Sequence, residues 1–183
     1  METITYQNIT IDGAPYTRLL EVNINHQINN HGQAFISGEV DGEAGTEFVK
    51  RVDETMFITL RTTASGQPPV LFCGVVADVG LSREKDYTRL QLTLKSASST
   101  LDMQKNEKSF QNTGKTYEDI LNEVLLSDAK LTMAVTDKPI GTIIMQYQET
   151  NWDFVKRMAS VFSAPVITNL NTVIPQITIG ISN

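Results

Sequence analysis

Residues 70–96 read VLFCGVVADVGLSREKDYTRLQLTLKS and contain two strand-forming runs separated by a charged turn at residues 83–86. In the second run Leu90, Leu92 and Leu94 alternate with polar residues, a pattern typical of a strand with one buried face. The first run, VLFCGVVADV, is almost continuously apolar, so we expect it to lie near the centre of its sheet. The stretch therefore predicts two strands of an antiparallel sheet.

The same period of two continues towards the N-terminus. In LEVNINHQI, residues 20–28, apolar side chains alternate with polar ones, and Met56, Ile58 and Leu60 form a further alternating run. Residues that favour turns separate these runs at 29–32, 41–42 and 65–69. From about residue 16 to residue 97 we therefore expect an antiparallel β-barrel or sandwich.

The pattern changes after residue 97, where helical periodicity appears. Residues 117–125 place their apolar side chains on one helix face, and Thr116 stands at the N-cap position. A second amphipathic helix is predicted within residues 150–162, capped by Thr150 or Asn151. Further strands are expected at residues 143–148, 164–168 and 175–181.

These patterns give the fold class and the domain organisation. We expect a mainly β chain with an α+β second half: an antiparallel barrel-like domain followed by a mixed α/β region with two amphipathic helices. The change of pattern falls within residues 97–106, although no linker rich in Pro, Gly or Ser marks it. The predicted domains are therefore residues 1–103 and residues 104–183, the second being the start of a further domain.

The composition excludes several classes of function. The formal net charge of -6 argues against a surface for nucleic acid or anionic lipid, which requires clustered Lys and Arg. No run approaches the roughly 20 apolar residues that span a bilayer, so we expect no membrane insertion and synthesis in the cytoplasm. The single cysteine, Cys73, lies in an apolar run, which predicts a small buried side chain.

Motifs for catalysis are incomplete. Gly114-Lys115-Thr116 precedes a helix, but a phosphate-binding loop needs a further glycine where this chain has Ser109. His26 and His31 lie in and just after one strand without accompanying ligands, so we interpret them as a surface strand histidine and a turn histidine. The carboxylates around Asp119 follow the polar side of a helix. We therefore predict no enzyme, no cofactor, no metal site and no small-molecule substrate.

MQYQETNWDFVKRMASVF, residues 145–162, resembles the most recognisable stretch of the VgrG and phage late-control D family. In that family a strand ending in Gln-Tyr-x-Glu-Ser/Thr-Asp leads into a helix of the form x-Phe-hydrophobic-x-Arg-hydrophobic-Ala. The corresponding positions here are Gln146, Tyr147, Glu149, Thr150, Trp152, Phe154, Arg157, Met158 and Ala159.

Upstream segments follow the order of the same family. They resemble its Phe-x-Gly-x-Val strand, its Tyr-x-Leu-x-Leu strand, a Phe-Gln segment and an amphipathic helix, on Phe72, Gly74, Val76, Tyr87, Leu92, Leu101, Phe110, Gln111, Ile120 and Val124. The resemblance covers roughly residues 70–168.

The resemblance implies a structural role in a contractile injection machine such as a phage or prophage tail or a type VI-like secretion apparatus. Proteins of this family form a homotrimeric baseplate hub of tail-tube-like barrels between the tail tube and the spike. The implied partners are the tail tube protein, the spike protein and other baseplate proteins, with no specific nucleic acid. We expect Trp152, Phe154, Tyr147 and Phe110 in the core, and Arg157 paired with Glu149 or with a neighbouring subunit.

The chain departs from the family pattern in three places. Asn151 stands where the family commonly has Asp, and residues 163–165 replace a glycine-containing turn. The chain also ends on the apolar strand PQITIGISN, where the family's hub region continues. The chain is therefore either a compact variant or the N-terminal piece of a longer protein. Because so apolar a strand prefers a partner on each side, we favour the piece.

Two other functions compete with the hub. A small-ligand or peptide-binding β-barrel predicts a monomer with a concave apolar pocket. A nucleotide hydrolase using Lys115 and Thr116 predicts nucleotide binding with magnesium, but its motif is incomplete.

Overall fold

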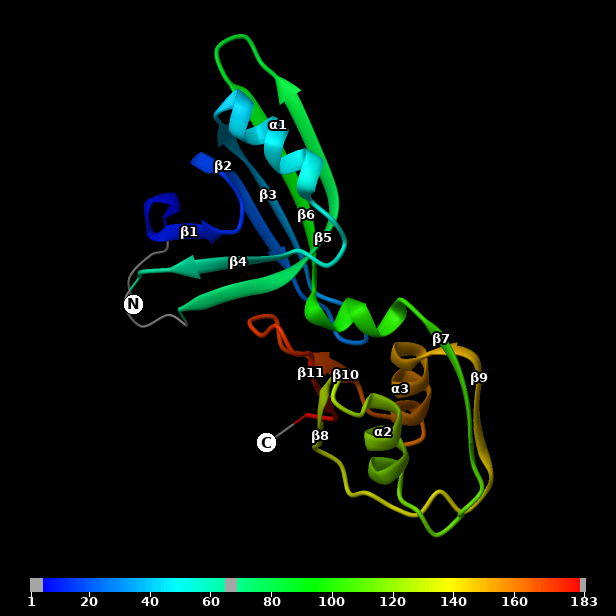
Figure 1. Cartoon of the computed structure of the whole chain (residues 1–183). Helices are drawn as coiled ribbons and strands as arrows, with labels where there is room; N and C mark the ends of the chain where they lie inside the picture. Colours follow the sequence, from blue (N-terminus) through cyan, green and yellow to red (C-terminus); the bar gives the residue numbers. More distant parts are fainter. Residues whose placement is uncertain (1–4, 65–68, 182–183) are drawn as a thin grey trace. The chain divides into compact units, whose positions relative to one another are not determined.

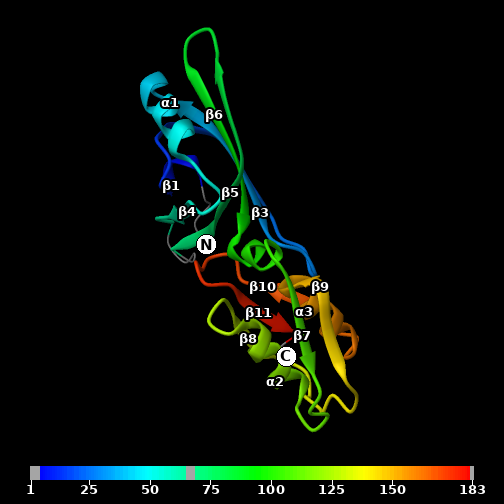
Figure 2. The ribbon, with the colours of Figure 1, turned by 45° about the vertical axis from the view of Figure 1, so that its right-hand side comes forward.

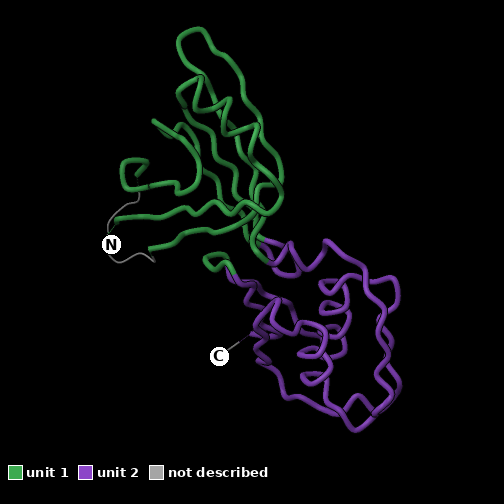
Figure 3. Tube along the Cα trace, viewed as in Figure 1, with its two compact units in different colours: residues 1–26, 32–97, 170–173 green, residues 27–31, 98–169, 174–183 purple. Residues whose placement is uncertain are grey.

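The computed structural model describes residues 5–64 and 69–181 and divides the chain into two compact units (Figure 3). Unit 1 comprises residues 1–26, 32–97 and 170–173, and unit 2 comprises residues 27–31, 98–169 and 174–183. The main division follows Ala97, within the predicted change of pattern at 97–106. Two short segments are exceptions: residues 27–31 belong to unit 2, and residues 170–173 belong to unit 1. Most of the predicted turn at 65–69 lies outside the described residues.

Unit 1 is a six-stranded antiparallel, barrel-like sheet with strand order β1-β4-β5-β6-β3-β2 (Figure 1). Its elements are η1 (Tyr6–Asn8), β1 (Ile9–Asp12), β2 (Tyr16–Asn25), β3 (Gln33–Val40), α1 (Gly42–Arg51), β4 (Phe57–Thr62), β5 (Val70–Arg83) and β6 (Thr88–Ser96). The predicted barrel-like class is therefore confirmed. The apolar run at 70–79 forms the first part of β5, which lies between β4 and β6 as expected for a central strand.

The core of unit 1 forms from the alternating side chains that the sequence indicated. Ile58, Leu60, Leu90, Leu92 and Leu94 are all fully buried, and they pack with Ala34, Ile36, Val40, Phe48, Phe72 and Val76. Cys73 is buried, as predicted. Burying each of these large side chains contributes about 1.5–3 kcal/mol, so the interior alternating face specifies the register of the strands.

Helix α1 corrects the expectation of a turn at Asp41-Gly42. Asp41 is the N-cap, and its carboxylate accepts hydrogen bonds from the backbone amides of Glu43 (3.0 Å) and Ala44 (3.2 Å). Phe48 is the buried side chain that fixes the helix against the sheet. Gly45 permits this packing, because a Cβ there would lie 2.7 Å from the Val40 side chain.

Unit 2 contains two sheets and two helices, seen from a second side in Figure 2. Its elements are η2 (Ala97–Asp102), β7 (Lys105–Phe110), α2 (Tyr117–Leu125), β8 (Lys130–Met133), β9 (Ile144–Thr150), α3 (Asn151–Ser160), β10 (Val166–Thr168) and β11 (Gln176–Ile179). Strands β7 and β9 form a two-stranded ribbon, and the other sheet has the order β10-β11-β8. Both predicted helices and the α+β character of this half are confirmed.

The last strand has neighbours on both sides within this chain. β11 pairs antiparallel with β10 and parallel with β8. Its apolar side chains, Ile177 and Ile179, are buried in the core of unit 2. Because both edges of this strand are paired and its apolar side chains are buried, its apolar sequence is not itself a reason to expect further strands.

No helix in the described residues is long and apolar enough to cross a membrane.

At Gly74 the pairing of β5 with β4 overlaps its pairing with β6, since Gly74 pairs with both Ile58 of β4 and Ser96 of β6. A Cβ at Gly74 would overlap the backbone carbonyl oxygen of Lys95 and lie 2.7 Å from the Phe72 ring. The backbone of β6 cannot move away without breaking its pairing. Only glycine fits this position.

We predict that Gly74→Ala lowers the free energy of unfolding by about 1–3 kcal/mol, as expected for overpacking against backbone. Urea unfolding followed by circular dichroism measures the change. Gly80→Ala is the matched control in the same strand, because the nearest heavy atom to its Cβ would lie 3.8 Å away. Equal midpoints for the two variants would contradict the proposed constraint.

Candidate functional site

The candidate site is the β9–α3 segment, which carries five of the ten sequence-predicted site residues: Tyr147, Glu149, Trp152, Phe154 and Arg157. Along β9, Ile144 and Gln146 point inward and are buried, whereas Met145 and Tyr147 are exposed by 56% and 67%. The prediction that Tyr147 lies in the core is therefore wrong. Because side chains alternate along a strand, the inward position of Gln146 requires Tyr147 to face outward.

Buried Gln146 belongs to a network of side-chain amides that joins the ribbon to α3. Its Nε2 donates to Oδ1 of Asn151 (2.9 Å) and to the backbone oxygen of Glu149 (3.1 Å). Asn106 of β7 donates to the same Oδ1 (3.0 Å). The Asn151 amide group in turn donates to the carbonyl of Val124 in α2 (3.4 Å). Asparagine at position 151 thus supplies both an acceptor and a donor, which a carboxylate cannot do.

Thr150 is the N-cap of α3. Its Oγ1 accepts a hydrogen bond from the backbone amide of Asp153 (3.1 Å) and donates to Oδ1 of Asp102 (2.7 Å). Of the two caps that the sequence allowed, the structure therefore uses Thr150, and Asn151 has the network role described above. Such a cap typically contributes about 1 kcal/mol.

Arg157 and Glu149 form a two-bond ion pair across the β9–α3 turn. Arg157 Nε lies 2.9 Å from Oε1 of Glu149, and its Nη2 lies 2.7 Å from Oε2. The same Nη2 donates to the backbone oxygen of Met145 (2.7 Å). Hydrogen bonding to Glu149 raises the pKa of the Arg157 guanidinium. The predicted pairing within the chain is confirmed, and it also covers one point along the edge of β9.

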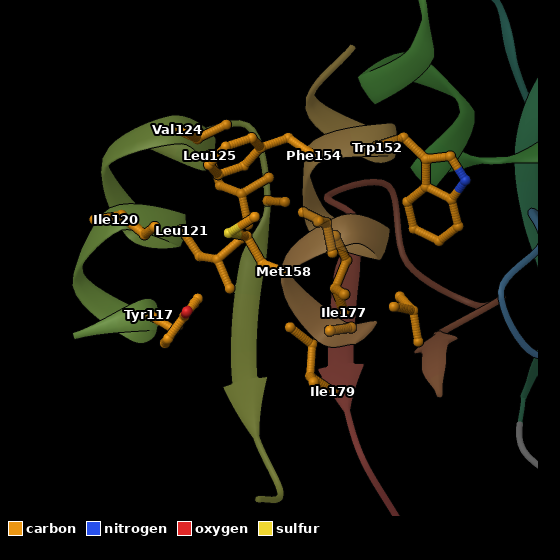
Figure 4. Packing of buried hydrophobic residues seen from close by; sticks show 14 of the residues in the cluster. Tyr117, Ile120, Leu121, Val124, Leu125, Trp152, Phe154, Met158, Ile177 and Ile179 are labelled. Carbon is orange, nitrogen blue, oxygen red and sulfur yellow. The ribbon is translucent and has the colours of Figure 1, made fainter. Parts of the chain in front are cut away.

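The remaining predicted residues of unit 2 form its core (Figure 4). Phe110, Ile120, Val124, Trp152 and Phe154 are all buried, and the rings of Phe110 and Phe154 lie 5.8 Å apart. These side chains come from β7, α2 and α3, so the motif connects three elements. Two further predicted motif residues, Phe72 and Gly74, lie in β5 of unit 1, where Phe72 packs in the core of that unit.

His31 contacts Trp152, so its interpretation as a simple turn histidine is wrong. Its ring centroid lies 4.4 Å from that of Trp152, and its side chain is only 13% exposed. Nδ1 lies 2.8 Å from Ser98 Oγ, and Nε2 lies 2.9 Å from Asp102 Oδ2. His26 follows the last residue of β2 rather than lying within the strand.

Ser98, His31 and Asp102 are residue types that nucleophilic hydrolases use, but their placement does not suit that chemistry. Ser98 is 1% exposed, so a substrate cannot reach its hydroxyl. The trio instead connects segment 27–31, η2 and α3 by hydrogen bonds. Spacing in the sequence offered no signal for this cluster, because Ser98 and Asp102 lie more than 60 residues from His31.

The other candidate for chemistry is a helix cap. Thr116 and Asp119 form a capping box at the start of α2, and Lys115 pairs with Glu123. These contacts occupy the groups that a phosphate-binding loop would use. Within residues 5–64 and 69–181, no three His, Cys, Asp or Glu side chains are grouped so as to hold a metal ion.

We predict that Trp152→Ala lowers the free energy of unfolding by about 3–5 kcal/mol, because it removes the largest buried side chain of the motif. Tyr147→Ala, which removes an exposed ring, changes it by less than about 0.5 kcal/mol. Thermal unfolding followed by circular dichroism compares the two. A Trp152→Ala variant that melts with the wild type would refute the packing role.

Arg157→Ala is expected to lower the free energy of unfolding by about 1 kcal/mol, since the ion pair is partly exposed but has two-bond geometry. Arg51→Ala, at the exposed end of α1, is the charge-matched control. Chemical denaturation at low and high salt measures both variants. An Arg157→Ala variant as stable as Arg51→Ala would show that the pair contributes nothing to stability.

Comparison with solved structures finds three proteins of the same fold. The chain aligns over 94% of its length with each of three proteins: the E. coli c3393 protein (TM-score 0.61, 16% identity), the 43 kDa tail protein of prophage MuSo2 from Shewanella oneidensis (0.68, 14%) and a tail protein from Neisseria meningitidis MC58 (0.63, 12%). The c3393 protein is described as a type VI secretion component with structural similarity to the T4 tail proteins gp27 and gp5. At these identities the likeness establishes the fold.

The chain spans about half the length of these proteins, namely 48%, 52% and 50%. A search of curated protein sequences gave no match. The family model described as phage tail baseplate hub (GPD) matches residues 39–160, about two-thirds of the chain. That match runs from β3 through α3 and so includes the whole β9–α3 motif. The chain therefore belongs to the phage tail baseplate hub (GPD) family.

Proposed function

We propose that this chain is a non-enzymatic structural subunit of the hub that links the tail tube to the spike in a phage tail or type VI-like injection apparatus. The observation that carries the proposal is the family match across residues 39–160, which spans parts of both units. The buried motif residues support it, because they serve packing and hydrogen bonding within unit 2.

The assembly we propose is a homotrimer, with the tail tube protein, the spike protein and other baseplate proteins as partners. The subunit is made and assembled in the cytoplasm of the producing cell. A β-rich subunit suits this role, because many parallel hydrogen bonds along paired strands share a mechanical load. Exposed strand edges provide surfaces for neighbouring subunits.

The ligand-binding alternative receives less support from unit 1. Two grooves of about 680 and 650 Å³ lie on its surface. The first is lined largely by charged and polar residues, among them Glu39, Asp41, Arg83 and Lys85. The second lies between β1 and β2. Both are open to solvent, unlike the concave apolar pocket that a small ligand requires.

We predict that the chain in solution has three times the 20.3 kDa mass of one subunit. Light scattering across a concentration series at two salt concentrations measures the mass. A persistent monomer would contradict the trimer.

The hub role itself is tested separately from the oligomer. A tagged copy expressed in the cell that carries the gene is expected to sediment with purified tail particles. A tagged protein that stays entirely in the soluble fraction while particles form would contradict the role.

A further inference from the structure

Residues 27–31, the connecting segment, join β2 to β3 along the chain but belong to unit 2. The segment begins with a four-residue turn, in which the backbone amide of Asn30 donates to the carbonyl of Gln27 (3.3 Å). Asn29, the third residue of this turn, has φ +62°. Turns of this kind place glycine or asparagine there, because few other residues adopt a positive φ. The sequence therefore suits the turn at its most demanding position.

Asn29 makes two hydrogen bonds with one residue of β10. Its backbone amide donates to the carbonyl oxygen of Val166 (2.8 Å), and its side-chain Oδ1 accepts from the backbone amide of Val166 (2.8 Å). In an antiparallel sheet, two opposite residues exchange the same pair of bonds through their backbones alone. The side chain of Asn29 thus takes the place of the carbonyl that a neighbouring strand would supply.

These two bonds lie on the side of β10 that faces away from β11. The amide of Gly180 donates to the carbonyl of Pro165, and the amide of Asn169 donates to the carbonyl of Gln176. Because backbone groups alternate in direction along a strand, those of Val166 face the opposite side. β10 is an edge strand of the β10-β11-β8 sheet, so the connecting segment covers the edge at Val166.

His31 holds the end of the connecting segment within unit 2. Its Nδ1 lies 2.8 Å from Ser98 Oγ, its Nε2 lies 2.9 Å from Asp102 Oδ2, and its ring lies 4.4 Å from that of Trp152. In contrast, the aliphatic side chain of the segment, Ile28, is 58% exposed. Asn29 and His31 are therefore two points at which the segment is fixed to unit 2.

The sequence around β10 favours pairing with other strands. β10 consists of Val, Ile and Thr, which are enriched in strands. No charged residue occurs from Met158 to Asn183, although charged side chains are a common means of preventing pairing at an edge. The opposite edge strand of the sheet, β8, begins with exposed Lys130. Uncharged segments of high β propensity associate readily when exposed, so β10 needs a cover of another kind.

We propose that the connecting segment is an intramolecular edge cap, in which Asn29 occupies the pairing groups of Val166 and keeps β10 from pairing with β10 of another copy. The cap is an inhibitory contact built into the fold. It does not depend on the hub function, because every contact that forms it lies within one chain.

Two substitutions at Asn29 separate the backbone conformation from the hydrogen bond. Asn29→Gly keeps the positive φ and removes the side-chain acceptor. Asn29→Asp retains an acceptor oxygen, and aspartate also tolerates the left-handed conformation. Asn30→Gly is the matched control, since Asn30 is exposed and its side chain is directed to Gln27 and Ile28 of the same turn, at 3.5 Å.

Amide hydrogen exchange at Val166, followed by NMR on the full chain, measures the cap. Exchange in Asn29→Gly is expected to be about fivefold faster than in the wild type, as for the loss of one ordinary hydrogen bond. Asn29→Asp and Asn30→Gly are expected to exchange at the wild-type rate. Light scattering over a concentration series is expected to show species larger than the wild-type assembly for Asn29→Gly alone. Circular dichroism melting curves verify that the variants are folded.

Each part of the inference has an outcome that would overturn it. Unchanged exchange at Val166 in Asn29→Gly means that the side chain does not cover the edge. Faster exchange without larger species means that the contact stabilises unit 2 but does not prevent strand pairing. Larger species from Asn30→Gly as well would attribute association to a loosened turn. The hub proposal is decided independently, by sedimentation with tail particles.

Discussion

Strand β5 organises unit 1 because it changes neighbours along its length. Its first half pairs with β4, its second half pairs with β6, and both pairings overlap at Gly74 and Val75. The absence of a side chain at Gly74 lets the carbonyl of Lys95 in β6 approach closely, where the pairings of β5 with β4 and β6 overlap. Beyond this overlap β4 pairs no further with β5, so within the described residues the second half of β5 pairs with β6 alone.

Unit 2 depends on a different kind of interaction. Its ribbon and helices are joined by the buried amide of Gln146 and the half-buried amides of Asn106 and Asn151, in which Asn151 receives hydrogen bonds from Gln146 and Asn106 and donates to the backbone of Val124. A buried amide without partners costs free energy, so this network forms only when the elements that supply its members are in place. The apolar contacts of Trp152 and Phe154 supply the burial, while the amides determine which arrangement is adopted.

Periodicity identified most of the strands and both helices of the second half, because their apolar side chains repeat at regular spacing. Periodicity did not predict helix α1, since Gly42 and Gly45 weaken the helical pattern and Asp41-Gly42 also favours a turn. The core placement predicted for Tyr147 is wrong, because the inward-facing position of this strand belongs to its polar neighbour Gln146. The contact between His31 and Trp152 joins residues far apart in the chain, and local patterns carry no information about such contacts.

The segment formed by residues 170–173 has a consequence for the order of folding during synthesis. It belongs to unit 1, where Leu170 packs against the core and its carbonyl accepts a hydrogen bond from the amide of Cys73 (2.6 Å). A ribosome releases the chain from its N-terminus, yet this part of unit 1 emerges only after nearly all of unit 2. The first unit to begin folding therefore cannot finish before the second has been synthesised, and maturation of the two units is coupled in time.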